Sequence, residues 1–349
     1  MEILKILSPV SKLNEVEKIV KEGADEVYCG VLTAEWQKKY NIVSINRRAD
    51  LHANFWTYKE LKKCVEIAHS YNTTVYLTLN QQYYTQKQHS LVLNCIEEAV
   101  NTGVDAFIVG SMDLLLTLIE INVDVDIVIS TTGTVFNSEA AKFYQNMGAK
   151  RIILPRQLTL KEIEGIVKNT KNIEFEVFIL NSKCPNVEGY CTFLHGMTTP
   201  RNELMYKSAC QLPYRIIPAN SKSNLKSAIE KQGIWQKIHM DSVPCGICAL
   251  YEFREMGITG VKIVGRDNPT WKKITDVIFL RKLVDYLEKQ NPTREMFRTM
   301  VRALYANYKM LLAQSGQVTP EMAQTLEDIG ENETLCRIST CYFPSVMGE

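Results

Sequence analysis

Residues 148–168 read GAKRIILPRQLTLKEIEGIVK and contain one complete strand-and-helix unit. The apolar run 151–155 is typical of a strand that is buried on both faces of a sheet. Thr159 and Glu162 form a capping box, which places the start of a helix at Thr159. Gly148 ends the preceding helix, because glycine readily takes the left-handed conformation in which many helices stop. The stretch therefore predicts a β-strand, a short loop and an α-helix, in that order.

The same alternation returns along the whole chain. Apolar strands are predicted at residues 3–7, 26–30, 74–80, 106–110, 126–130, 151–155, 175–180 and 260–265. Such strands, each followed by a helical pattern, predict an α/β fold of the (β/α)8 TIM-like barrel type, and an open doubly wound sheet is the alternative. We expect residues 1–290 to form the barrel and residues 291–349 to form a helical C-terminal extension.

The composition is that of an ordinary globular protein with little net charge. The 349 residues carry 40 basic and 39 acidic side chains, so nothing global indicates a nucleic-acid or membrane-surface partner. A local basic patch remains at Lys38-Lys39 with Arg47-Arg48. Neither a secretory signal nor an apolar run of about 18 residues occurs, so we expect a cytoplasmic protein without a membrane span. In the reducing cytoplasm, ten cysteines indicate buried thiols and metal ligands rather than disulfides.

Four cysteines lie in the long segment between the last two predicted strands. They are Cys184, Cys191, Cys210 and Cys245. Their spacing is C-x6-C-x18-C-x34-C, and Cys248 follows three positions later. Zinc sites usually contain a closely spaced cysteine pair in each half, whereas a 4Fe–4S cluster takes one thiolate per iron and accepts separated cysteines. The spacing favours a 4Fe–4S cluster. The alternative is a set of buried thiols, which we expect for Cys29, Cys64 and Cys95.

Active sites of such barrels lie at the carboxyl ends of the strands. Three cations at these ends, Lys262, Arg266 and Arg156, are candidate catalytic residues that suit a carboxylate-bearing small substrate. His52, in a predicted loop at the same rim, is a candidate general acid or base. The candidate substrate-binding residues are Asn54, Asn80 and Ser130. The alternative for these polar side chains is a local role, in surface ion pairs or in hydrogen bonds to loop backbone.

Six groups of residues occur together over residues 5–285. They are Gly23-Ala-Asp-Glu-Val-Tyr-Cys-Gly30, Asn54-Phe55 with Thr57, Ser130-Thr131 with Asn137, Gly148-Ala-Lys-Arg-Ile-Ile-Leu-Pro-Arg156, Glu176-Val-Phe178, and Gly257-Ile-Thr-Gly-Val-Lys-Ile-Val-Gly-Arg266. In this combination the chain resembles peptidase family U32, the collagenase-like proteases. The resemblance implies a barrel with a 4Fe–4S cluster on the four separated cysteines, and the distance to Gly257 prefers Cys245 over Cys248. It also implies oxygen-independent hydroxylation, in ubiquinone synthesis or on tRNA and rRNA bases, with prephenate as the oxygen donor.

The chain departs from the family pattern in three places. The usual His-Gly before the first ligand is Leu180-Asn181 here, and the usual acidic residue of the eighth strand is Val264. The C-terminal β-barrel that RNA-modifying members often carry is not visible, which lowers the expectation of an RNA substrate. We therefore expect an iron–sulfur oxidoreductase of the hydroxylase type that acts on a small molecule.

Three alternatives to a small-molecule hydroxylase stay open. The first is a U32-type peptidase, the second is an RNA base hydroxylase, and the third is a non-catalytic iron–sulfur subunit that binds a homologous U32 partner. The absence of G-x-S-x-G and H-E-x-x-H motifs disfavours the usual serine and zinc peptidase mechanisms. The roles of Cys336 and Cys341 are left open by the sequence.

Overall fold

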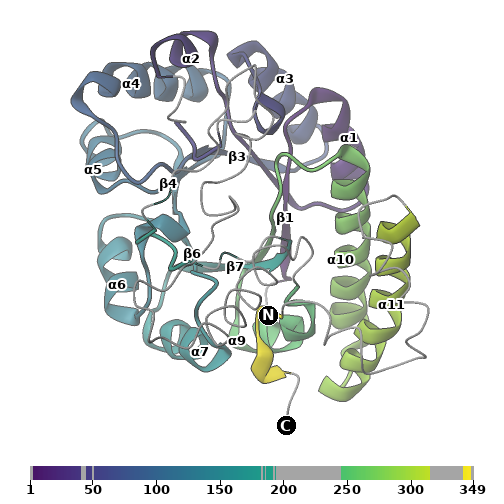
Figure 1. The fold of residues 1–349 in the computed structure, drawn as a ribbon. Coiled ribbons are helices and arrows are strands. Elements are labelled where there is room, and N and C mark those ends of the chain that lie inside the picture. The colour runs from purple at the N-terminus through teal and green to yellow at the C-terminus, as the bar shows by residue number, and fades with distance from the viewer. Residues whose placement is uncertain are drawn as a thin grey trace, which may run out of the picture.

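Eight parallel strands form a closed barrel with helices around it (Figure 1). The computed structural model describes residues 3–40, 45–48, 51–181, 184, 186–191, 193, 245–314 and 341–346. The strands are β1 (Lys5–Pro9), β2 (Glu26–Cys29), β3 (Thr74–Leu79), β4 (Ala106–Val109), β5 (Asp126–Ile129), β6 (Arg151–Ile153), β7 (Glu174–Leu180) and β8 (Gly260–Ile263). Each strand pairs with the next, and β1 closes the barrel against β8 through Lys5 and Gly260. The predicted TIM-like barrel is confirmed, and the open sheet is wrong.

The helices of the barrel, apart from α2, follow the predicted order. They are α1 (Leu13–Lys21), α2 (Ala34–Tyr40), α3 (Tyr58–His69), α4 (Gln86–Asn101), α5 (Met112–Glu120), α6 (Ser138–Asn146), α7 (Leu160–Asn169), α9 (Leu250–Met256) and α10 (Thr270–Gln290). The capping box is formed, because Thr159 Oγ1 accepts the Glu162 amide at 3.3 Å and the Glu162 carboxylate accepts the Thr159 amide at 2.7 Å. The first strand begins at Lys5, two residues later than predicted.

Apolar side chains and a buried ionic network fill the barrel. The apolar members are Leu7, Tyr28, Tyr76, Ala106, Ile108, Val128 and Ile153. The network is centred on Arg151 of β6, whose side chain is 2% exposed. Its guanidinium lies 2.5 Å from Glu26 and 3.2 Å from Glu176. Lys262 of β8 pairs with the other oxygen of Glu176 at 3.2 Å. Arg151 and Glu26 are the first residues of their strands, so the network lies toward the amino ends of the barrel strands, and Lys262 connects it to the lining of a pocket at the carboxyl ends.

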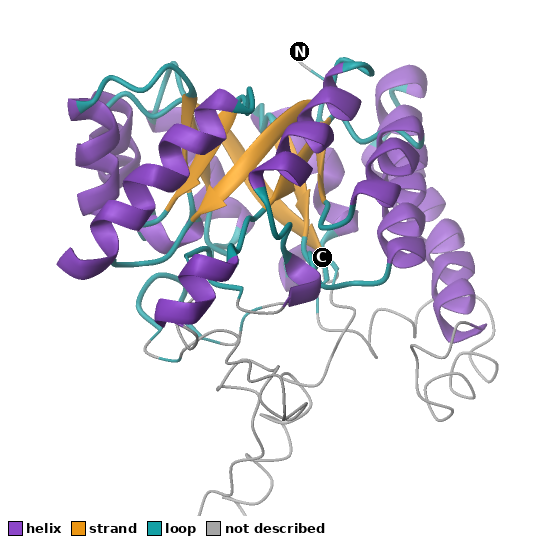
Figure 2. Cartoon of the chain, turned by 90° about the horizontal axis from the view of Figure 1, so that it is seen from above, coloured by secondary structure: helices purple, strands orange, loops and turns teal. Residues whose placement is uncertain are grey.

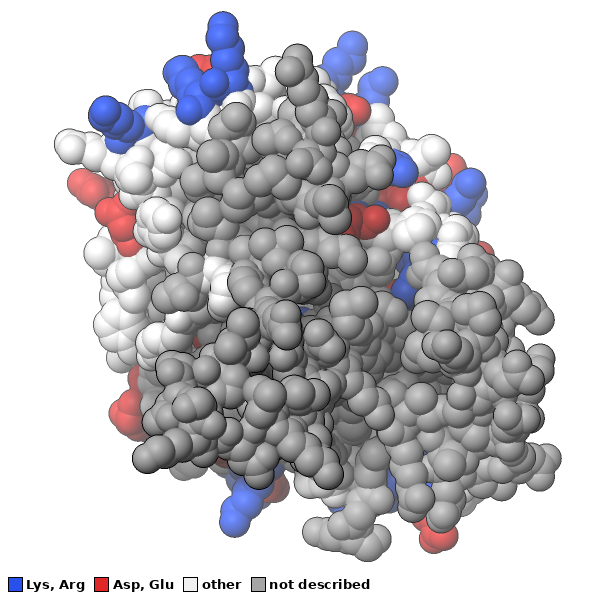
Figure 3. Space-filling model, viewed as in Figure 1, with Lys and Arg blue, Asp and Glu red and all other residues white. Residues whose placement is uncertain are grey.

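A long helix, α11 (Arg294–Gln314), lies along α10 outside the barrel (Figures 1 and 2). Aromatic rings join the two helices, since Phe279 and Tyr308 stack with centroids 4.5 Å apart. The predicted helical start of the C-terminal extension is thus present, while the division of the chain at residue 290 stays a prediction. No helix in the described ranges is long and apolar enough to cross a bilayer. Around the coloured periphery of the face in Figure 3, basic and acidic side chains are interspersed.

Candidate functional site

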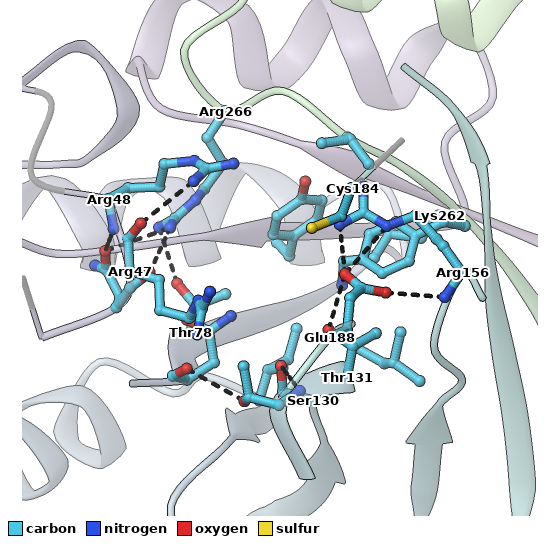
Figure 4. Close-up of a pocket in the computed structure, with 18 of the residues that line it drawn as sticks. Arg47, Arg48, Thr78, Ser130, Thr131, Arg156, Cys184, Glu188, Lys262 and Arg266 are labelled. Carbon is cyan, nitrogen blue, oxygen red and sulfur yellow. Dashed lines mark hydrogen bonds and ion pairs between the residues drawn. The ribbon is translucent and has the colours of Figure 1, made fainter. Parts of the chain in front are cut away.

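A pocket with a volume of about 100 Å³ opens at the carboxyl ends of the strands. Its described lining contains five basic side chains and one carboxylate. The charged residues are Arg47, Arg48, Arg156, Lys262, Arg266 and Glu188. Figure 4 shows two sides: Arg47, Arg48 and Arg266 lie together on one, and Cys184 lies on the other with Arg156 and Lys262. The lining therefore has an excess of positive charge, and the structure brings all three predicted catalytic cations together.

Arg266 is a buried cation whose partners are neutral. Its Nη1 donates to Thr78 Oγ1 at 2.9 Å and to Asn54 Oδ1 at 3.3 Å, and its Nη2 donates to the Asn46 carbonyl at 2.8 Å. Among the described residues, no carboxylate forms an ion pair with it. Burial, and then the charge of Arg48, lower the pKa of Arg266 to about 10. Gly30 leaves room for the guanidinium, because a Cβ at that position would overlap Arg266 Nη1.

Lys262 and Arg156, by contrast, each have a carboxylate partner. Lys262 Nζ lies 3.2 Å from Glu176 and 4.1 Å from the centre of the Tyr28 ring. Burial lowers the pKa of Lys262, and the charge of Glu176 opposes that shift. Arg156 forms an ion pair with Glu188, and the carboxylate also accepts the Arg156 amide at 2.8 Å. Of the predicted cations, Arg266 is therefore the one whose charge is least neutralised by protein.

Two predicted iron ligands lie at the pocket, and a third lies at the same rim. Cys184 and Cys191 are lining residues. Cys245 forms an isolated antiparallel bridge with Leu180, at the end of β7. Burial raises the pKa of the Cys184 thiol, and the charge of Arg156 acts in the opposite direction. Cys210 lies outside the described residues, so the complete set of four stays a prediction. Cys29, Cys64 and Cys95 are buried, as expected for core thiols.

The other predicted site residues fall into different positions. Asn80 and Ser130 line the pocket, and Asn80 Oδ1 is buried without a hydrogen-bond partner among the described residues. The Ser130 hydroxyl accepts the Thr132 amide at 3.4 Å, so it also has a local role. Asn54 is absent from the described lining and instead holds Arg266 from behind. His52 is exposed in a short 3-10 helix, Leu51–Ala53, and is also absent from that lining.

Three charged lining residues were not predicted as site residues. Arg47 and Arg48 were recognised only as part of a surface basic patch, yet both line the pocket. Arg47 has a φ of 60°, and the backbone just before it is held by residues distant in sequence, because Tyr84 donates to the Ile45 carbonyl and Arg266 donates to the Asn46 carbonyl. Glu188 offered a local signal, because it is the acidic residue between Cys184 and Cys191. Its pairing with Arg156, 32 positions away, is visible only in the folded chain.

Asn181 fixes the chain where it leaves β7 and enters the cysteine segment. Its φ is 67°, in the left-handed region that asparagine tolerates better than most residues other than glycine. Its Nδ2 donates to Asp276 at 2.8 Å, and its Oδ1 accepts from Lys272 at 2.9 Å. Tyr308 donates to the same Asp276 at 2.6 Å. Asn181, which stands where the resemblance implies a glycine, therefore takes a left-handed conformation and forms a buried polar network.

Replacing Asn181 by alanine should lower the free energy of unfolding by about 3 kcal/mol, because alanine resists this φ and leaves Asp276 and Lys272 short of partners. Asn72→Ala is the matched control, since Asn72 has a φ of 55° but is exposed. We expect that control to cost about 1 kcal/mol, from backbone strain alone. Urea unfolding of both variants measures the difference. Equal losses would show that the network around Asn181 contributes nothing to stability.

The sequence model of peptidase family U32 matches residues 11–315 of this chain. The tRNA hydroxylation protein P of Helicobacter pylori is 29% identical over 191 residues, which cover 55% of this chain and 42% of that protein. An uncharacterized protease of Methanocaldococcus jannaschii is 32% identical over 195 residues, covering 55% and 44%. A collagenase of Porphyromonas gingivalis is 26% identical over 273 residues, covering 75% and 61%.

The matches differ in how much of each protein they cover. This chain spans less than half the length of the first two relatives, at 42% and 44%. The match to the family model, in contrast, extends over nearly the entire barrel and α11. The pocket residues from Arg47 to Arg266 all lie within residues 11–315. The chain therefore belongs to peptidase family U32.

Proposed function

We propose that this chain is an iron–sulfur enzyme that performs oxygen-independent hydroxylation, or related redox chemistry, on a small anionic molecule. The observation that carries the proposal is the pocket's charge, five basic side chains against one carboxylate, beside two cysteine thiols. Arg266 is buried and bonded to neutral groups, and a buried charge in a low-dielectric site favours an anionic ligand. The family relatives include proteins named for tRNA and rRNA hydroxylation, which supports this class of reaction.

The residues at the cysteine side of the pocket suit a 4Fe–4S cluster. Cys184 and Cys191 border the same cavity; burial lowers the pKa of Arg47, and both cysteines lie close enough to oppose that shift. A cluster on four thiolates has a net negative charge, which these basic residues would balance. Cys210 and Cys245 would supply the remaining ligands. When bound, the cluster supplies one-electron redox chemistry next to the substrate pocket.

The arginine side of the pocket suits a carboxylate. Arg266, held by Thr78, Asn54 and Asn46, is oriented before a ligand arrives and could bind a carboxylate through two parallel hydrogen bonds. Lys262 on the floor and Asn80 Oδ1 on the wall add a donor and an acceptor. Prephenate, a dicarboxylate, has the chemistry that this side accepts. Prephenate would then serve as the oxygen donor, and the small molecule that is hydroxylated would be a separate substrate.

Two alternatives follow from the relatives' names. An RNA substrate is favoured by the tRNA and rRNA hydroxylation proteins, but basic and acidic side chains are mixed among the coloured residues of Figure 3, so the described part of that face shows no continuous basic track for a phosphate backbone. A peptidase is favoured by the name of the collagenase relative. Cys184 and Cys191 would then be thiols rather than iron ligands, and cleavage of peptides would survive removal of iron.

Metal analysis of anaerobically purified protein tests the proposal. We expect about four iron and four sulfide per chain, with absorbance near roughly 400 nm that fades in air. Cys184→Ala and Cys245→Ala should each lose most of the iron. Cys95→Ala is the matched control, because Cys95 is buried in the core away from the pocket and should retain the cluster. Zinc or no metal in the wild type, or full iron in both ligand variants, would contradict the proposal.

A further inference from the structure

The segment of residues 341–346 lies against the rim of the barrel, beside the cysteine segment. Cys341 pairs with Cys245 in an isolated parallel bridge, and the Tyr342 amide donates to the Cys245 carbonyl at 2.9 Å. Phe343 packs edge-on against Phe253 of α9, with ring centroids 5.1 Å apart. Tyr342 and Phe343 are only 2% and 4% exposed. The C-terminal segment is therefore packed into the same region as a predicted iron ligand.

Tyr342 contacts three parts of the site at once. Its hydroxyl donates to the Asn181 carbonyl, where the chain enters the segment that contains Cys184. The same hydroxyl lies close to the guanidinium of Arg156, which lines the pocket. Its backbone amide holds the carbonyl of Cys245. One residue thus contacts both ends of the cysteine segment, through its hydroxyl at Asn181 and its backbone amide at Cys245, and also a pocket cation.

We infer that Tyr342 is a positioning residue, which holds the first and last cluster ligands and Arg156 in a fixed relation. The inference rests on the proposed function, since it concerns the ligands Cys184 and Cys245. Asn181 and Cys245 are far apart in sequence, and their flanking residues meet where Leu180 bridges Cys245 and the Gly246 amide donates to the Ile179 carbonyl at 2.7 Å. Tyr342 bridges the two ends, with a hydroxyl on one and an amide on the other. Without the hydroxyl, the ends would separate more readily and the cluster would be more exposed to oxygen.

The test compares Tyr342→Phe with the wild type after anaerobic purification. Phenylalanine keeps the packed ring and removes only the hydroxyl. We expect the variant to bind iron, to lose its visible absorbance in air about tenfold faster, and to show a shifted cluster reduction potential. Tyr144→Phe is the matched control, because the Tyr144 hydroxyl also donates to a backbone carbonyl, that of Gly133, at 2.9 Å. It should behave like the wild type.

A second variant displaces the segment without removing a polar group. A Cβ at Gly246 would lie 2.8 Å from the Phe343 ring, so Gly246→Ala should move the segment and reproduce the faster loss in air. Hydrogen exchange of the metal-free proteins gives a readout that needs no cluster, and we expect faster exchange around Asn181 in both variants. Unchanged lifetime, potential and exchange in Tyr342→Phe would overturn the inference. A wild type without iron would instead overturn the proposed function, and hydrogen exchange would then decide the role of Tyr342.

Discussion

Arg266→Gln is expected to weaken the binding of prephenate by about a hundredfold, measured by calorimetry on the anaerobic protein. Removal of one partner from a buried, hydrogen-bonded charge pair costs about 2–5 kcal/mol, and about 1.4 kcal/mol is a factor of ten in affinity. Arg266 is chosen over Arg156 and Lys262 because those two cations already have carboxylate partners. Glutamine keeps hydrogen-bonding capacity toward Thr78 and Asn46 while it removes the charge.

The control for this experiment removes an arginine charge elsewhere. Arg281 pairs with Asp25 at 3.2 Å and does not line the described pocket, so Arg281→Gln should leave the affinity within about twofold. Glu188→Gln should instead raise the affinity for prephenate, because loss of the carboxylate in the lining makes the pocket more favourable to an anion. Equal affinities of the Arg266 and Arg281 variants would remove Arg266 from the proposed carboxylate site.

The fold was readable from the sequence because each unit carries its own local signals. The strand over 151–155 and the capping box at Thr159 depend on neighbouring residues only, and both appear in the structure. Helix α2 was not predicted, since its seven residues, AEWQKKY, place only Trp36 in the core. Short elements of this kind are fixed by tertiary packing, which a periodic pattern does not reveal.

The site was predicted less completely, because its geometry depends on contacts between distant segments. The strand-end positions of Arg156, Lys262 and Arg266 follow from the barrel, so they could be predicted once the strands were known. The sequence could not predict which of these cations is neutralised, because the carboxylates of Glu176 and Glu188 reach them from other strands and loops. For the same reason the contact between Tyr342 and Asn181, 161 residues apart, has no local signature.

Arg151→Met is expected to lower the free energy of unfolding by about 3–5 kcal/mol at pH 7, because it leaves buried carboxylates without their partner. Arg151 forms two bonds to Glu26, at 2.5 and 2.9 Å, and further bonds to Glu174 and Glu176. Lys142→Met is the surface control, since Lys142 pairs with Glu139 on an exposed face of α6 and should cost less than about 0.5 kcal/mol.

The pH dependence of the Arg151 variant separates lost charge pairing from lost packing. In the wild type, burial alone would raise the pKa of Glu26, but the hydrogen bonds and charge of Arg151 outweigh burial and hold it below 4.5. The carboxylate therefore stabilises the fold above its ordinary pKa, and that contribution is lost as the pH falls through the lowered value. In Arg151→Met burial remains the largest effect, and only the charge of Lys5 and the Tyr76 hydroxyl oppose it, so the pKa of Glu26 should rise and the penalty should shrink as the pH falls. Denaturation at pH 7 and pH 5 should show a narrowing gap, and a constant gap would assign the loss to packing.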